Sequence, residues 1–342
     1  MKAILYCICL LLLLNNASAR AHFAKDSLRV FKDETPLQIT ISTNLKKMLF
    51  EKAKGIVQPA TISISFPDSS VITEKISLNA RGVFRRKNCY LPSLKLHFKS
   101  SDSSRLKKLK DLKLVCPCGN GKEDEQLLLK EYLVYKMYNL LTDKSFKVRL
   151  ARITFTDSEK ARKDITKYTF FIEDIDALAD RNKCKEVNNL KLHTENTNRQ
   201  HTTLVTIFQY MIGNTDWAVP VNHNVKFITN KKPPVEKPYI IPYDFDFAGI
   251  VNAYYATPSK DLGTTSVQER AYRGFGRTME ELLPVITLLN EQKNNIYGLI
   301  QNFALLADIQ KRSMTKYLDE FYNLVSSPAN IRYEFIDNAR TE

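Results

Sequence analysis

The segment YMIGNTDWAVPVNHNVKFITNKKPPVEKPYIIPYDFDFAG, residues 210–249, decides how the rest of this chain is interpreted. Its turn Gly213-Asn214-Thr215-Asp216 ends an apolar run and presents a carboxylate. Two further apolar runs, 225–228 and 239–241, flank a connector rich in lysine and proline. That order predicts an antiparallel hairpin.

Hairpin geometry predicts which polar side chains of this segment meet. The start of the first strand and the end of the second lie about 5 Å apart. Asn224 should therefore lie beside Asp244, and the short loop keeps Asp216 close. Carboxylates that converge without arginine are costly unless a cation or substrate occupies the site. The competing interpretation is that Asp216 is only a turn residue and that Asp244 and Asp246 only end a strand.

The order of elements predicts an α+β chain. Alternating apolar residues predict strands at 37–41, 61–66, 71–78, 91–98, 148–155 and 168–172. Residues 79–87 form a basic loop around Gly82, and the clearest helix covers 124–141. We expect a strand-rich region at 20–175 with one long helix, and a mainly helical region at 176–342 that contains the carboxylate hairpin.

The N-terminus is typical of a secretory signal. Residues 1–19 combine Lys2, an apolar stretch and the small residues Ala17-Ser18-Ala19. No later segment is apolar enough to span a bilayer. We therefore expect a secreted or periplasmic protein, cleaved near Ala19, without a transmembrane segment.

Four cysteines remain after residue 19. An even number in an exported chain permits two disulfides. Cys116 and Cys118 are too close for an easy mutual bridge, so the sequence predicts that this segment pairs with Cys89 or Cys184. A zinc site would need a second close pair of cysteines, which this sequence lacks.

The charge is strongly basic, with 51 Lys and Arg against 37 Asp and Glu, a net of +14. Such a balance favours anionic partners such as nucleotide phosphates, acidic glycans or a lipid surface, although a solvated basic surface gives the same count. Basic and aromatic residues do not alternate in a way that predicts a specific nucleic-acid partner.

With these motifs in place, the chain resembles the CotH kinase family of secreted atypical kinases. The residues that carry the resemblance, over about 75–250, are Arg81-Gly82, SLKLHF at 93–98, LLLKEYLVYKMY, the FIEDID motif, GNTD and IPYDFD. The sequence departs from the family where Tyr243 replaces a tryptophan and Leu91-Pro92 replaces a lysine pair. The resemblance implies a two-lobed protein-kinase-like fold.

The resemblance also implies a cofactor, ATP with Mg²⁺ or Mn²⁺, and roles for the hairpin residues. Asp216 would be the catalytic base. Asp244 would be the principal metal ligand, helped by Asp246. Asn224, or Asn222, would be the amide ligand. The acceptor would be a hydroxyl group of a protein or glycan.

Residues of the strand-rich region would hold the nucleotide. Lys95 would contact phosphate oxygens, and Arg81 and Gly82 would cover them. Glu131 is a candidate partner for Lys95, and Glu173 aligns with an acid of the family. Competing interpretations make Lys95 a solvated strand lysine and Glu131 an ordinary surface acid.

Three functions stay open at this point. The first is an exported kinase that transfers phosphate from ATP to a protein or glycan hydroxyl. The second is a pseudokinase-like binding module that does not transfer phosphate. The third is a carboxylate-dependent glycan hydrolase in which Asp216 and Asp244 act as acid and base.

Overall fold

The computed structural model describes residues 30–341 except 32, 67–68, 99–105, 107–108, 110, 189–190 and 234–235. The predicted signal at 1–19 lies outside these residues. Among the described helices, none combines the length and apolarity required to cross a bilayer.

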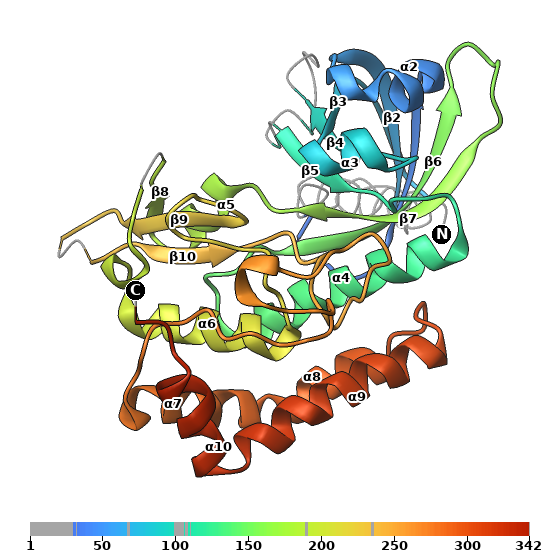
Figure 1. The fold of residues 1–342 in the computed structure, drawn as a ribbon. Helices are drawn as coiled ribbons and strands as arrows, with labels where there is room; N and C mark the ends of the chain where they lie inside the picture. Colours follow the sequence, from blue (N-terminus) through green and yellow to red (C-terminus); the bar gives the residue numbers. More distant parts are fainter. Residues whose placement is uncertain are drawn as a thin grey trace, which may run out of the picture.

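Seven strands of the first half of the chain close into a β-barrel (Figure 1). They are β1 (Leu37–Thr43), β2 (Gln58–Ser65), β3 (Val71–Arg81), β4 (Ser93–His97), β5 (Asp111–Val115), β6 (Val148–Asp157) and β7 (Ile165–Ile172). Their order around the barrel is β1-β2-β3-β4-β5-β7-β6, and a parallel pairing of β1 with β6 completes the circle.

The closed barrel shows that the predicted two-lobed protein-kinase-like fold is wrong. The physical reason lies in β1, which pairs with β2 on one side and with β6 on the other. Leu37 is matched with Ala151 and Thr43 with Asp157, so the pairing joins segments more than a hundred residues apart. No local pattern signals such a contact, and the two-lobed expectation rested on the order of elements and on the resemblance to CotH kinases.

Alternation along the strands fills the barrel, as the sequence predicts. Ile39 and Ile41 of β1 are buried, as are Leu94 and Leu96 of β4, while Thr40 is exposed. Two short helices, α2 (Leu45–Phe50) and α3 (Val83–Asn88), and the 3-10 turn η1 (Lys52–Lys54) lie outside the strands. The predicted basic loop at 79–87 is thus the end of β3 followed by α3.

The second half of the chain is mainly helical around a three-stranded sheet. The predicted hairpin is confirmed as β9 (Val225–Asn230) with β10 (Tyr239–Pro242), and β8 (Cys184–Glu186) adds a third strand. The helical elements are α5 (Ile175–Arg181), η3 (Thr194–Asn196), α6 (Arg199–Ile212), η4 (Lys260–Leu262), α7 (Met279–Glu291), α8 (Lys293–Gln301), α9 (Asp308–Val325), α10 (Pro328–Arg332) and η5 (Tyr333–Asp337).

Helix α4 (Lys122–Leu141) joins the two halves and confirms the helix predicted at 124–141. Figure 1 shows it between the barrel and the red C-terminal helices. Tyr135 is 1% exposed and packs against Phe170 of β7 and Phe245 after β10. Aromatic contacts of this kind add to the free energy of burial. One face of α4 is thereby fixed against the strand-rich part and the hairpin at once.

A disulfide connects Cys89, at the end of α3, to Cys118, before α4. The predicted link between the Cys116/Cys118 segment and Cys89 is confirmed. Cys116 and Cys184 are free and buried. The bridge is reinforced by a backbone hydrogen bond from Leu91 N–H to the carbonyl of Cys118, at 3.2 Å.

We expect loss of this bridge in a Cys89→Ser/Cys118→Ser variant to lower the free energy of unfolding by about 2–5 kcal/mol, because it closes a loop of 29 residues. Urea unfolding measures the loss. Peptide mapping of the non-reduced protein should recover Cys89 and Cys118 as one linked peptide, and recovery of both as free thiols would contradict the pairing.

Candidate functional site

Asp216 and Asn224 are in contact, in agreement with the expectation that the short loop keeps Asp216 close. The Asn224 side-chain amide donates to the Asp216 backbone carbonyl at 2.7 Å and to its Oδ2 at 3.0 Å. His223 Nε2 lies 2.7 Å from Asp216 Oδ1. Both oxygens of the carboxylate are therefore held by neighbours, while its side chain stays 37% exposed and accessible.

Three residues around the hairpin adopt left-handed backbone conformations: Asn222 (φ 55°), Asn224 (φ 51°) and Asp244 (φ 64°). Asn and Asp tolerate this region better than other residues with a side chain. The backbone amide of Tyr243 donates to the Asn224 carbonyl at 3.0 Å, so these bends lie at the same end of the hairpin. The predicted neighbours therefore lie next to adjacent strands, since Asn224 directly precedes β9 and Asp244 follows β10.

A buried cluster of carboxylates lies beside this end of the hairpin. Glu131 of α4, Asp244 and Asp246 each offer an oxygen, and these oxygens all lie within 4.8 Å of one another. Such a set of hard oxygen ligands could hold a divalent cation. Asp244 and Asp246 were predicted as ligands, whereas Glu131 was assigned to another role.

Arg85 of α3 faces this cluster. Its Nη2 lies 3.1 Å from Glu131 Oε2 and 2.9 Å from Asp246 Oδ2, while Nη1 donates to the Cys116 carbonyl at 2.7 Å. Gly82, at φ 79°, precedes α3 and turns the chain from β3 so that α3 can approach the cluster. Sequence reasoning missed Arg85, which stood in an apparently exposed basic loop.

Two tyrosines fix the strand end that carries Asp244 and Asp246. The buried Tyr135 hydroxyl accepts the backbone N–H of Asp244 at 2.8 Å. The Tyr255 hydroxyl donates to Asp246 Oδ2 at 3.3 Å. Asp246 thus has two partners, whereas the side chain of Asp244 has no hydrogen bond or ion pair to any other described residue. Asp244 is the carboxylate available to a ligand.

In this cluster, burial outweighs the attraction of Arg85 for the carboxylates. Burial raises the pKa of Asp246 to about 6, with Arg85 opposing and Asp244 and Asp216 adding to the rise. Burial likewise raises the pKa of Glu131 well above its ordinary value, against the lowering by Arg85. Glu131 Oε1 is also buried with no hydrogen-bond partner among the described residues. One further cation would relieve all three carboxylates.

Lys95 and Glu131 do not pair, and this expectation is corrected. Lys95 lies 2.8 Å from Asp111 on the neighbouring strand, and Glu131 is bound by Arg85. The alternative that Glu131 is a surface acid is also wrong, because it is 1% exposed. The two expectations, for Lys95 and for Glu131, are wrong for the same reason. Their actual partners, Asp111 and Arg85, lie on other elements, and no local sequence pattern shows that these elements come close.

Glu173 makes its contacts away from the carboxylate cluster. It lies 3.0 Å from Arg181 Nη2 and accepts the backbone N–H of Lys147 at 3.0 Å. These bonds connect the end of β7 to α5 and to the start of β6. Its predicted part in cofactor binding stays a prediction.

Lys113 of β5 is a second residue that the sequence did not single out. Burial lowers its pKa to about 8, and the nearby cations Arg81 and Lys226 lower it further. Its ammonium lies 5.7 Å from the ring centre of Tyr243, and it forms no ion pair with the described residues. Asp174 and Glu186 oppose this shift, and Lys226 is itself paired with Glu186 at 3.0 Å. An anionic group beside Lys113 and Arg81 would be stabilised.

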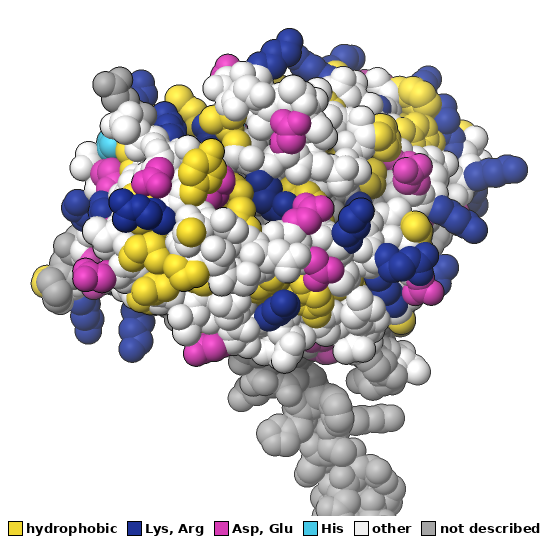
Figure 2. Space-filling view, turned by 60° about the horizontal axis from the view of Figure 1, so that its bottom comes forward, with side chains coloured by type: hydrophobic (Ala, Val, Ile, Leu, Met, Phe, Trp, Pro, Cys, Tyr) yellow, Lys and Arg dark blue, Asp and Glu magenta, His cyan; other side chains and the backbone are white. Residues whose placement is uncertain are grey.

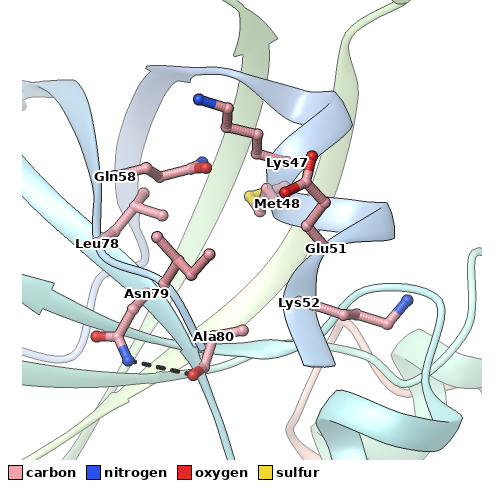
Figure 3. A pocket seen from close by; sticks show the side chains of 9 residues that line it. Lys47, Met48, Glu51, Lys52, Gln58, Leu78, Asn79 and Ala80 are labelled. Atoms are coloured by element: carbon pink, nitrogen blue, oxygen red, sulfur yellow. Dashed lines mark hydrogen bonds between the residues drawn. The ribbon is translucent and has the colours of Figure 1, made fainter. Parts of the chain in front are cut away.

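A cavity of about 110 Å³ lies between α2 and β3 (Figure 3). Met48 and Leu78 supply apolar surface, and three charged side chains surround it: Lys47 of α2, Glu51 directly after α2, and Lys52 of η1. None of the predicted site residues lines it. It is therefore separate from the carboxylate cluster.

No model of a known protein family matches the chain, and no curated protein matches it either. The resemblance to CotH kinases therefore stays a hypothesis. The function must be argued from the chemistry of the site itself.

Replacing Arg85 with methionine should strongly destabilise the protein. Glu131 and Asp246 would stay buried without their direct counter-charge, which typically costs about 3–5 kcal/mol. Adding Glu131→Gln to this variant should restore part of the lost free energy of unfolding, because it removes one of the two buried carboxylates left without a counter-charge. Urea unfolding of both variants beside Arg152→Met, an exposed arginine of β6, measures the difference. An equal loss in the two arginine variants would contradict a special role for Arg85.

Replacing Lys113 with methionine should stabilise the protein at pH 7 and lose this advantage by about pH 10.5. The pKa of Lys113 is lower in the folded protein, about 8, than its ordinary 10.5. The unfolded chain therefore binds more protons between these values, and wild-type stability rises with pH through that window. Unfolding free energies of the two proteins from pH 7 to 10.5 test this. A difference that does not change with pH would show that Lys113 has no such shift.

Proposed function

We propose that this protein is a cation-dependent phosphotransferase that moves a phosphoryl group from ATP to a hydroxyl group of a protein or glycan. The observation that carries the proposal is the buried carboxylate cluster in which Glu131 Oε1 has no hydrogen-bond partner within the described chain. A buried polar atom without a partner is costly, and a bound cation would satisfy it.

The donor set fits Mg²⁺ or Mn²⁺. Asp244, Asp246 and Glu131 offer carboxylate oxygens, and Mg²⁺ is commonly held by one or two carboxylates together with substrate phosphates. A bound cation would supply neutralisation of the negative charge on the transferred phosphoryl group. Asp244 would be the main protein ligand, because its side chain is half-buried and has no partner among the described residues.

The basic side of the site suits phosphate oxygens. Lys113 and Arg81 are close enough to influence each other's charge, and neither is neutralised by a direct carboxylate contact within the described residues. Lys95 was the predicted phosphate ligand, but Asp111 already neutralises it. Lys113 is the better candidate, because a phosphate would offset the electrostatic cost of its position.

Asp216 is placed to accept a proton. Asn224 donates to its Oδ2, and His223, when its Nε2 carries the proton, donates to Oδ1. These bonds orient the carboxylate. In the proposed reaction the acceptor hydroxyl gives its proton to Asp216, its oxygen bonds to the terminal phosphorus of ATP, and ADP leaves.

One observation favours a second candidate, a binding module that does not transfer phosphate. Arg85 already occupies Asp246 and one oxygen of Glu131, and a guanidinium there competes with a metal ion for the same oxygens. Such a site would bind nucleotide weakly or without a cation. Measuring binding and transfer separately distinguishes the two candidates.

We expect Asp244→Asn to weaken Mg²⁺-dependent ATP binding at least about tenfold without lowering the thermal stability of the free protein, because it removes one of several repelling charges. Asp216→Asn should instead leave ATP binding within about twofold and cut transfer by about 10²–10⁴-fold. Asp164→Asn, an exposed aspartate in the loop between β6 and β7, is the matched control.

Calorimetric titration with ATP, with and without Mg²⁺ or Mn²⁺, measures the first effect. Phosphate transfer to a protein and glycan mixture from labelled ATP measures the second. Cation-independent binding without transfer would support the binding module. An absence of ATP binding in the wild type would reject both and leave the hydrolase.

We also propose that this protein is exported. This proposal rests on the signal-like residues 1–19, which the structure does not describe. An exported kinase would act on acceptors outside the cytoplasm, which agrees with a protein or glycan substrate.

A further inference from the structure

Lys130 of α4 is buried in a way that nothing described so far explains. Its residue is 2% exposed, yet it forms no hydrogen bond or ion pair with any other described residue. The adjacent residue Glu131 forms its ion pair with Arg85 and not with Lys130. Lysines are almost never fully buried without a partner. A partner from outside the chain would account for the position.

The side chain of Lys130 lines a cavity of about 490 Å³ between α4 and α9. Figure 1 shows α9 below α4, and Figure 2 brings the lower side of that view forward, with Lys and Arg among apolar side chains. The walls are Glu123, Leu127 and Lys130 of α4, Ile309, Gln310, Arg312, Ser313 and Lys316 of α9, and Asn252. The spacing on each helix places these residues on one face.

The cavity carries an excess of positive charge. Lys130, Arg312 and Lys316 line it, and Glu123 is the one acid among its lining residues. Neither Arg312 nor Lys316 forms an ion pair with another described residue. The lining therefore carries three cations against one carboxylate.

We propose that this cavity binds a sugar that carries a phosphate ester. The anionic group would pair with Lys130, with Arg312 and Lys316 at the rim adding attraction. Asn252, Gln310 and Ser313 offer amides and a hydroxyl that suit sugar hydroxyl groups. The volume exceeds that of a single ion and matches a small-molecule site. This inference stands independently of the proposed phosphotransfer.

Titration with glucose 6-phosphate, inorganic phosphate and glucose tests the inference on the whole protein. We expect glucose 6-phosphate to bind, phosphate to bind at least tenfold more weakly, and glucose to show no binding. No binding of glucose 6-phosphate, or equal binding of glucose, would overturn the inference. Phosphate binding as tight as that of the sugar phosphate would overturn the assignment of a sugar.

Two variants localise the binding. Lys130→Met should lower the affinity for glucose 6-phosphate at least tenfold and leave the thermal stability equal or higher, because an unpaired buried charge is removed. Ser313→Asp, at an exposed position of α9, should lower it similarly by repulsion. Lys136→Met, further along α4 and paired with Glu34, should stay within twofold. Unchanged binding in Lys130→Met would overturn the inference.

The variant Asp244→Asn tests whether the cavity between α4 and α9 is a site separate from the carboxylate cluster. If glucose 6-phosphate occupied the carboxylate site instead, this variant would change its affinity, and that result would overturn the inference. Unchanged affinity in Asp244→Asn, together with loss in Lys130→Met, supports a second site whether or not ATP binds.

Discussion

The contacts of Arg85 decide how the parts of this protein meet. One guanidinium bonds to a carbonyl 31 residues away, to a carboxylate 46 residues away and to another 161 residues away. Buried ion pairs hold only when their remaining donors and acceptors are satisfied, and here two nitrogens of the guanidinium have close partners. The barrel, helix α4 and the loop after β10 therefore converge on one side chain. The disulfide after α3 fixes the same segment covalently.

The same contact leaves the site with unbalanced charge. Arg85 forms ion pairs with two of the three adjacent carboxylates, Glu131 and Asp246. The pKa values of both are raised, because burial outweighs the attraction of Arg85. Asp244 stays outside the contact, held only through its backbone by Tyr135. A structural ion pair would need no third carboxylate. The site therefore combines Arg85, which stabilises the fold, with Asp244, whose side chain stays available to a ligand.

The parts of the structure that could be predicted from sequence are those governed by near neighbours. The position of Asn224 beside the strand end of Asp244 could be predicted, because antiparallel pairing of two apolar runs brings the start of the first beside the end of the second. The helix at 124–141 followed from its spacing. The barrel could not be predicted, because the pairing of β1 with β6 depends on residues distant in sequence. The role of Arg85 was missed for the same reason, since both of its acidic partners belong to other elements.

Two lysines change how the basic composition is interpreted. A net charge of +14 alone is compatible with a solvated surface, and solvated lysines keep their ordinary pKa. Lys113 and Lys130 have pKa values lowered to about 8 instead, each chiefly through burial. Placing a cation where its charge is disfavoured costs stability, and that cost is recovered when an anion binds. The two lysines lie on different elements, Lys113 on β5 and Lys130 on α4, so an anion bound beside one of them would not offset the cost of burying the other.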